Sequence, residues 1–301
     1  MDTQAALDSF VASLRARGSG QTLSRYTRAC TSLVEQLDGK PLRALTRHDV
    51  QRALASLHAG GLSPRTLAVT LSAWRTWFRH LAKIGEADPA IFSGIKAPRA
   101  PKRLPNALTE SEAMQLVDAP ASAAEPHSPA IAARDQAMFE VLYGCGIRIG
   151  ELVGLDIRDA DLDRGEIRVF GKGQKERLVP LGAPACVAIR SWLALRPSLV
   201  IDTTLSALFV GARGDRVSPP VVRRALKMRA LQQGITSHVY PHRLRHSFAS
   251  HVLQSSQDLR AVQELMGHAS IASTQVYTHL DFQHLANVYD QAHPRARKRK
   301  T

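Results

Sequence analysis

The segment His242-Arg243-Leu244-Arg245-His246 carries side chains that suit a phosphate group. On a helix, positions 242, 245 and 246 share one face. An arginine there can donate two parallel hydrogen bonds to phosphate oxygens, and a histidine beside it can accept or give a proton near neutral pH. For this segment by itself, a solvent-exposed basic face is an equally good interpretation. His242 and His246 also have the i,i+4 spacing of a helical metal pair, but no acidic residue lies between them, so we expect no metal site and no cofactor.

Four other polar residues could take part in phosphate chemistry. Arg148 begins the segment Arg-Ile-Gly-Glu-Leu, and Lys172 lies between two glycines. His268 follows Met-Gly, and Tyr277 lies nine residues after His268. A tyrosine hydroxyl can act as a covalent nucleophile, although a single tyrosine is far more often structural. The Gly-Lys-Gly sequence lacks the glycine spacing and the following Ser or Thr of a nucleotide-binding P-loop.

The order and spacing of these residues resemble the tyrosine recombinase family, which is also called the phage integrase family. The six matching residues are Arg148, Lys172, His242, Arg245, His268 and Tyr277. The resemblance covers essentially the whole chain. The segment 278–296 is especially similar to the Xer subfamily. The Ala-, Pro- and Ser-rich stretch 119–133 looks longer than the family pattern, but it lies away from the motifs.

The resemblance implies a reaction at a DNA phosphate. Tyr277 would attack the scissile phosphate and form a 3′-phosphotyrosyl link, which releases a 5′-hydroxyl. Arg148 and Arg245 would stabilise the charge that develops on the nonbridging oxygens, and His268 would donate a further hydrogen bond. Because one ester is exchanged for another, rejoining needs no ATP.

The same resemblance implies how protons move. His242 is expected to accept the proton of Tyr277, and Lys172 to protonate the leaving 5′-oxygen. Glu151, one helical turn from Arg148, is expected to hold that arginine in position. The arginines and Lys172 would supply the positive charge that a metal ion supplies in nucleases.

A further implication of the resemblance is an assembly on DNA. The substrate would be a double-stranded recombination site, bound by two copies of this chain and two copies of a XerD-like recombinase. The expected role is DNA recombination and integration that resolves chromosome dimers, for chromosome partition at cell division, with a DNA translocase as a candidate activator. Three alternatives stay open: a phage- or transposon-type integrase, a type IB topoisomerase, and a DNA-binding protein without catalysis.

The composition agrees with a nucleic-acid partner. The 301 residues include 40 Lys and Arg against 26 Asp and Glu, which gives a net charge of +14, and neutralising phosphates releases counterions. A hydrophobic content of 44% excludes a disordered chain. No apolar run is long enough to span a membrane and the N-terminus has no secretory signal, so we expect a cytoplasmic protein without membrane contact. The 3 cysteines lack metal-type spacing, which argues against a zinc site or a disulfide scaffold.

Two domains are predicted to position the candidate residues, in a fold that is mainly α. Residues 1–95 read as a helical domain, which the resemblance implies is a core-binding domain that contacts DNA. Residues 96–105 hold four basic residues and three prolines without an acid, which predicts an extended basic linker. Residues 106–301 read as an α-rich catalytic domain with a small antiparallel β-sheet, followed by a basic tail at 295–300.

Local signals predict several element boundaries. Thr46 and Asp49 form a predicted capping box, and Ser63-Pro64 predicts the start of a helix. The aromatic stripe that this helix carries is expected to lie in the core. The stretch 119–133 is predicted to be a loop. Residues 166–170 and 176–180 are predicted to pair as a hairpin around a glycine-bearing loop.

Overall fold

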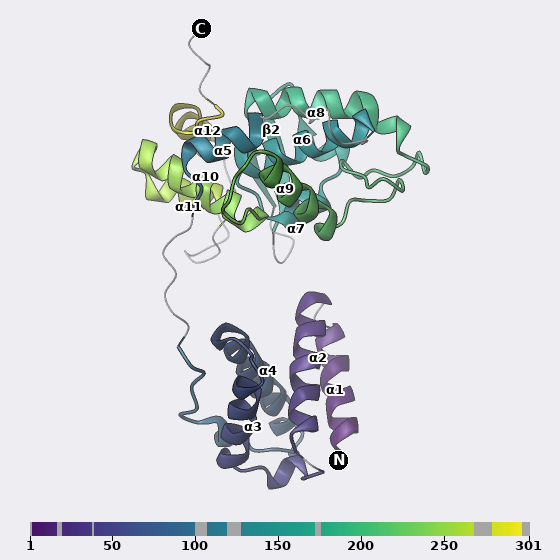
Figure 1. Cartoon of the computed structure of the whole chain (residues 1–301), viewed down its shortest axis with the longest axis vertical. Helices are drawn as coiled ribbons and strands as arrows, with labels where there is room; N and C mark the ends of the chain where they lie inside the picture. Colours follow the sequence, from purple (N-terminus) through teal and green to yellow (C-terminus); the bar gives the residue numbers. More distant parts are fainter. Residues whose placement is uncertain are drawn as a thin grey trace. The chain divides into compact units, whose positions relative to one another are not determined.

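The computed structural model describes residues 2–16, 20–37, 39–99, 107–118, 128–171, 176–267 and 279–296. Contacts within the chain divide it into two units, Met1–Arg103 and Leu104–Thr301 (Figure 1). In the described ranges, no helix is both long enough and apolar enough to cross a membrane. The predicted linker at 96–105 and the predicted basic tail at 295–300 lie partly outside these ranges.

The described residues of unit 1 form a bundle of four helices, with one short 3-10 turn between the second and third helices and another after the fourth. Its elements are α1 (Thr3–Ala16), α2 (Gly20–Glu35), η1 (Leu42–Ala44), α3 (Arg47–Ala59), α4 (Pro64–Ala82) and η2 (Pro89–Phe92). The aromatic stripe of α4 lies in the core, as predicted, because Trp74 and Trp77 are fully buried. The indole of Trp74 donates to the Ala29 carbonyl of α2 (2.6 Å), and the indole of Trp77 donates to the Ala6 carbonyl of α1 (3.2 Å). These two bonds tie α4 to both neighbouring helices.

The predicted helix starts of unit 1 are confirmed. The Asp49 backbone N–H donates to the Thr46 hydroxyl (3.3 Å), and the Thr46 backbone N–H donates to the Asp49 carboxylate (2.9 Å). At α4, the Thr66 backbone N–H donates to the hydroxyl of Ser63 (3.2 Å), and Pro64 occupies the first turn. Each cap uses groups within three residues of each other, which is why sequence spacing predicts it.

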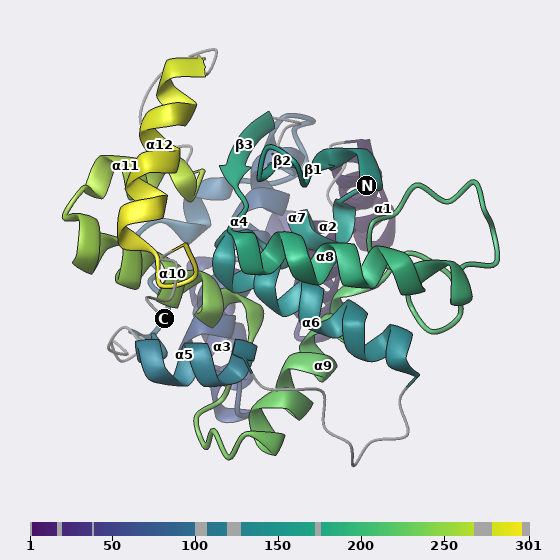
Figure 2. The same ribbon diagram turned by 90° about the horizontal axis from the view of Figure 1, so that it is seen from above.

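Unit 2 is built around α6 (Pro129–Gly144), whose residues 137–144 are all buried. Helix α8 (Ala183–Leu195) packs along α6 (Figure 2). Helix α10 (Pro241–Ser256) also packs against α6. Helix α12 (His279–Ala292) in turn packs on α10. The remaining helices are α5 (Glu110–Asp118), α7 (Ile149–Gly154), η3 (Ile157–Asp159), η4 (Arg196–Ser198), α9 (Pro219–Gln232) and α11 (Leu259–Leu265).

One predicted loop is wrong over part of its length. Residues 129–133 belong to the first turns of α6, whereas 119–127 lie outside the described residues. The Ser128 hydroxyl accepts from the Ala130 backbone N–H (3.3 Å), and Pro129 occupies the first turn. This is the same Ser-Pro signal that predicts the start of α4. The surrounding stretch is rich in alanine and proline, and that composition led to the prediction of a loop.

The predicted hairpin is confirmed and gains a third, short strand. The strands β1 (Ala160–Asp161), β2 (Glu166–Phe170) and β3 (Glu176–Pro180) form an antiparallel sheet in the order β1-β2-β3. Val169 pairs with Arg177, and Ile167 pairs with Val179. All four of these residues are buried, so an arginine takes a core-facing position of β3. A mainly helical fold with a small antiparallel sheet is therefore confirmed.

Candidate active site

Arg148 occupies the N-terminal cap of α7, directly after the turn that follows α6. Its backbone N–H donates to Glu151 Oε2 (2.7 Å), and its Nη1 donates to Glu151 Oε1 (2.9 Å). The predicted contact between Glu151 and Arg148 is thereby confirmed. The Arg148 side chain is 45% exposed and the Glu151 side chain only 4%. A buried carboxylate thus holds an arginine that faces solvent.

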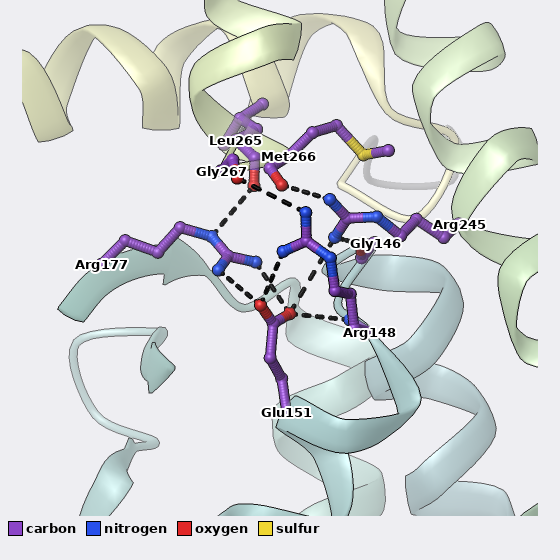
Figure 3. A network of polar contacts seen from close by, with 8 residues as sticks. All are labelled: Gly146, Arg148, Glu151, Arg177, Arg245, Leu265, Met266 and Gly267. Carbon is purple, nitrogen blue, oxygen red and sulfur yellow. Dashed lines mark hydrogen bonds and ion pairs between the residues drawn. The ribbon is translucent and has the colours of Figure 1, made fainter. Parts of the chain in front are cut away.

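Two further arginines approach the same carboxylate. Arg177 of β3 donates from Nη1 to Glu151 Oε1 (2.8 Å) and from Nη2 to Oε2 (3.0 Å). Arg245 of α10 brings its Nη1 to 3.9 Å from Glu151 Oε2. Figure 3 shows all three guanidinium groups turned toward Glu151 from different elements. Three positive charges therefore surround one negative charge, and the surplus favours an anion such as phosphate.

Glu151 remains ionised in this setting. Burial by itself would raise its pKa, but hydrogen bonds and charge from Arg177, together with the two bonds from Arg148, outweigh burial and lower the pKa to about 2. Burial of Arg245, added to repulsion by Arg148, lowers the pKa of that guanidinium to about 10. At neutral pH the cluster therefore consists of charged groups.

Backbone carbonyls hold the arginines from the other side. Arg245 Nη1 donates to the Gly146 carbonyl (2.6 Å), and its Nη2 donates to the Met266 carbonyl. Arg148 Nη2 donates to the Gly267 carbonyl (3.4 Å) (Figure 3). Met266 and Gly267, the two residues that directly follow α11, thus present their carbonyls to the cluster at the helix end where the dipole favours cations. These contacts place the backbone of Met266 and Gly267 against the arginines, directly before the candidate residue His268 in the sequence.

The backbone conformation and the surroundings of position 146 require a glycine. Its φ is +58°, and a Cβ built on it would come within 2.3 Å of Phe248 Cδ1. Both the left-handed backbone and the close ring exclude a larger side chain. This turn aims the Gly146 carbonyl at Arg245 and leads the chain into Arg148.

We expect Gly146→Ala to lower the free energy of unfolding by about 2 to 5 kcal/mol, from left-handed strain and overpacking together. Urea denaturation of the full chain measures this effect. Gly150→Ala is the matched control, because a Cβ at Gly150 in helix α7 meets no described atom within 4 Å. That control should leave stability unchanged or raise it by up to about 1 kcal/mol. Equal stability of the two variants would contradict the crowding at Phe248.

Helix α10 separates the residues that were expected to share one face. His242 and His246 are exposed, and their ring centroids lie 4.3 Å apart. Arg245 is buried instead, as are Leu244 and Phe248 of the same helix. One residue represents about 100° of helical rotation, so position 245 turns toward the core side of the 242–246 stripe. The prediction that positions 242, 245 and 246 share one face of the helix is therefore only partly correct.

The structure brings together Arg148 and Arg245 among the six predicted site residues, and it places His242 one turn before Arg245 on α10. The other three, Lys172, His268 and Tyr277, lie outside the described residues.

Sequence reasoning missed Arg177. Its signal was the two-residue period of the strand, because Arg177 and Val179 lie two residues apart and therefore share the buried face of β3. A charged residue at a core-facing position needs a buried partner. Applied to residues 176–180, that rule would have marked Arg177 as part of a polar cluster.

Comparison with known proteins adds independent findings. A model of the phage integrase family matches residues 106–284, and a model of the phage integrase N-terminal SAM-like domain matches residues 7–85. A tyrosine recombinase XerC from Alcanivorax borkumensis is 49% identical, over 94% of this chain and 91% of the relative. A tyrosine recombinase XerC from Salmonella typhi is 45% identical, over 93% of this chain and 91% of the relative.

Solved structures share the fold. XerH site-specific recombinase bound to difH substrate, in a pre-cleavage complex, matches with a TM-score of 0.69 at 24% identity, over 93% of this chain and 82% of that one. A lambda integrase dimer bound to a COC′ core site matches with a TM-score of 0.68 at 18% identity, over 92% of this chain and 100% of that one.

Proposed function

The chain belongs to the phage integrase family of tyrosine recombinases, and from that premise we propose that Tyr277 is the residue with which it cuts and rejoins DNA. Membership makes the protein a DNA-binding enzyme of site-specific recombination. The predicted similarity to the Xer subfamily is confirmed by the relatives, which are of the XerC type.

The arginine cluster is the observation that carries the proposal. Arg148, Arg177 and Arg245 surround one buried carboxylate, so the cluster has a surplus of positive charge and one solvent-facing guanidinium, that of Arg148. A phosphodiester gains negative charge on its nonbridging oxygens when a nucleophile adds to it. Preorganised guanidinium groups stabilise that charge, and removing one such donor typically costs about 10²–10³ in rate.

The proposed reaction is a balanced exchange of esters. The Tyr277 oxygen forms a bond to phosphorus while the bond from phosphorus to the 5′-oxygen breaks, which leaves a 3′-phosphotyrosyl link and a 5′-hydroxyl. His242 accepts the tyrosine proton, Lys172 gives a proton to the 5′-oxygen, and His268 donates a hydrogen bond to the phosphate. Attack of a new 5′-hydroxyl on the link reverses each step, so the reaction consumes no nucleotide.

We further propose the assembly that the sequence resemblance to the Xer subfamily implies. Two copies of this chain and two of a XerD-like recombinase bind two DNA sites, exchange strands through a four-way junction and resolve chromosome dimers. Mixing the chain, with and without such a second recombinase, with a paired-site substrate tests this. Exchange by this chain alone would favour a phage- or transposon-type integrase, and relaxation of supercoils without junction resolution would favour a topoisomerase.

One experiment tests the chemical proposal directly. A duplex with a nick close to the scissile phosphate loses its short 5′-hydroxyl fragment after cleavage, so the covalent intermediate accumulates. Denaturing electrophoresis should show a protein–DNA adduct, and peptide mapping should locate the DNA on Tyr277. No adduct at any recombination site tested would refute the proposal in favour of DNA binding without catalysis.

The two domains and the basic linker are proposed to act on DNA together. We expect fragments 1–95 and 106–301 each to bind the site more weakly than the full chain, because tethering raises the effective concentration of the second domain to about millimolar. The slope of log affinity against log salt should also be steeper for the full chain, since more phosphates are neutralised. Mobility-shift titrations at several salt concentrations measure both. A fragment with the affinity and slope of the full chain would contradict the proposal.

A further inference from the structure

Arg177 is the member of the arginine cluster to which the proposed reaction gives no role. Its side chain is 7% exposed, so a buried strand position is occupied by a full positive charge. We propose that Arg177 is a positioning residue for DNA cleavage, which holds the Glu151 carboxylate so that Glu151 can hold Arg148. This inference rests on the role of Arg148 in the proposed function.

Both oxygens of the Glu151 carboxylate accept hydrogen bonds from Arg148 and Arg177. Oε1 accepts from the side chains of Arg148 and Arg177, and Oε2 accepts from the Arg148 backbone and from Arg177. Arg177 thus supplies one bond to each oxygen, in the planar fork that only a guanidinium offers. Because Glu151 is buried, water cannot easily replace these bonds. Without them the hydrogen bonds that remain on the carboxylate come only from Arg148, the residue that it has to orient, and Arg245 lies 3.9 Å away as an ion-pair partner.

Arg177 also makes contacts beyond Glu151. Its Nε donates to the Leu265 carbonyl at the end of α11 (3.3 Å). Gly267, with a φ of +60°, lies so close that a Cβ there would meet the guanidinium at 3.0 Å. One side chain therefore joins strand β3, helix α7 with Glu151, and the backbone at Leu265 and Gly267. Figure 3 shows Arg177 reaching this junction from β3.

The inference predicts a new pH dependence of cleavage. Glu151 is faced by Arg148 from the cap of α7, Arg177 from β3 and Arg245 from α10. With Arg177 present, the pKa of Glu151 is lowered to about 2, so Glu151 is ionised at neutral and at mildly acid pH. Removal of Arg177 leaves the effect of burial less opposed, so the pKa of Glu151 rises. The variant should then cleave more slowly as pH falls through that raised pKa, because a protonated Glu151 no longer pairs with Arg148.

The test uses the full chain and the nicked duplex, and it measures the single-turnover rate of adduct formation between about pH 5 and pH 8. Arg177→Met should slow cleavage by roughly 10- to 100-fold, as loss of a residue that orients a site ligand does elsewhere. Its rate should fall further toward acid pH, relative to the unchanged chain. In Arg177→Met/Glu151→Gln that added acid loss should vanish, and the rate should be no slower than that of Glu151→Gln alone.

Arg168→Met is the matched control. Arg168 lies on the neighbouring strand β2 and pairs with Glu176, but its side chain is 50% exposed. This variant removes the same charge from the same hairpin and should cleave within about twofold of the unchanged chain, as expected for a surface pair. Binding of the DNA site with unchanged affinity verifies that each variant folds.

Arg177→Lys covers the case in which Arg177→Met does not fold. Lysine keeps the positive charge but not the fork, so this variant should bind the site normally and still cleave slowly. Cleavage by Arg177→Lys at the unchanged rate, or full additivity of Arg177→Met with Glu151→Gln, would overturn the inference. If the unchanged chain itself forms no adduct, the proposed function fails first and the inference falls with it.

Discussion

Tyr277→Phe should form no covalent adduct with DNA and yet bind its site with unchanged affinity. The substitution removes one oxygen, the proposed nucleophile, and leaves the ring. Loss of the nucleophile in other covalent enzymes lowers the rate by a factor on the order of 10⁶. Denaturing electrophoresis on the nicked duplex measures the adduct, and a mobility shift measures binding.

Tyr289→Phe is the control for this prediction. Tyr289 is a buried tyrosine of α12, twelve residues further along the chain, with a role in packing against Phe248 and His293. Its phenylalanine variant should form the adduct at the level of the unchanged chain. An adduct of full strength from Tyr277→Phe would move the nucleophile to another residue.

Lys172→Ala should cleave normal DNA slowly and recover most of its rate when sulfur replaces the bridging 5′-oxygen. The normal leaving group is an alkoxide whose parent pKa is roughly 15–16, like that of water, so it needs a proton. A thiolate leaving group has a parent pKa nearer to about 8.5 and needs little help. A general acid contributes about 10²–10⁴ in rate, and sulfur should restore most of that loss. Single-turnover cleavage of the two duplexes measures the effect.

Arg148→Ala and Arg245→Ala are the comparison for Lys172→Ala. Both arginines are proposed to stabilise nonbridging oxygens, so sulfur at the bridging position should not rescue either variant. Equal impairment of Lys172→Ala on both duplexes would show that Lys172 acts through charge alone. The role of general acid would then pass to His242 or Lys175.

Short-range chemistry could be predicted from the sequence. The caps at Thr46 and Ser63, the pairing of residues 166–170 with 176–180, and the contact of Glu151 with Arg148 are all confirmed. Each depends on groups within a few residues or on strand alternation, so spacing along the chain specifies the partner. The start of α6 has the same kind of signal, Ser128 followed by Pro129, although a loop was predicted there.

Long-range chemistry was decided by the tertiary structure. The partner of Arg177 lies 26 residues away at Glu151, and Arg245 donates to a carbonyl 99 residues earlier in the chain. Residue types and order along the chain determined which family the protein belongs to and which residues are candidates for its chemistry. Only the packing of α7, α10, α11 and β3 around one buried carboxylate decided that three arginines share it, because burial forces charged groups to find partners wherever the fold brings them together.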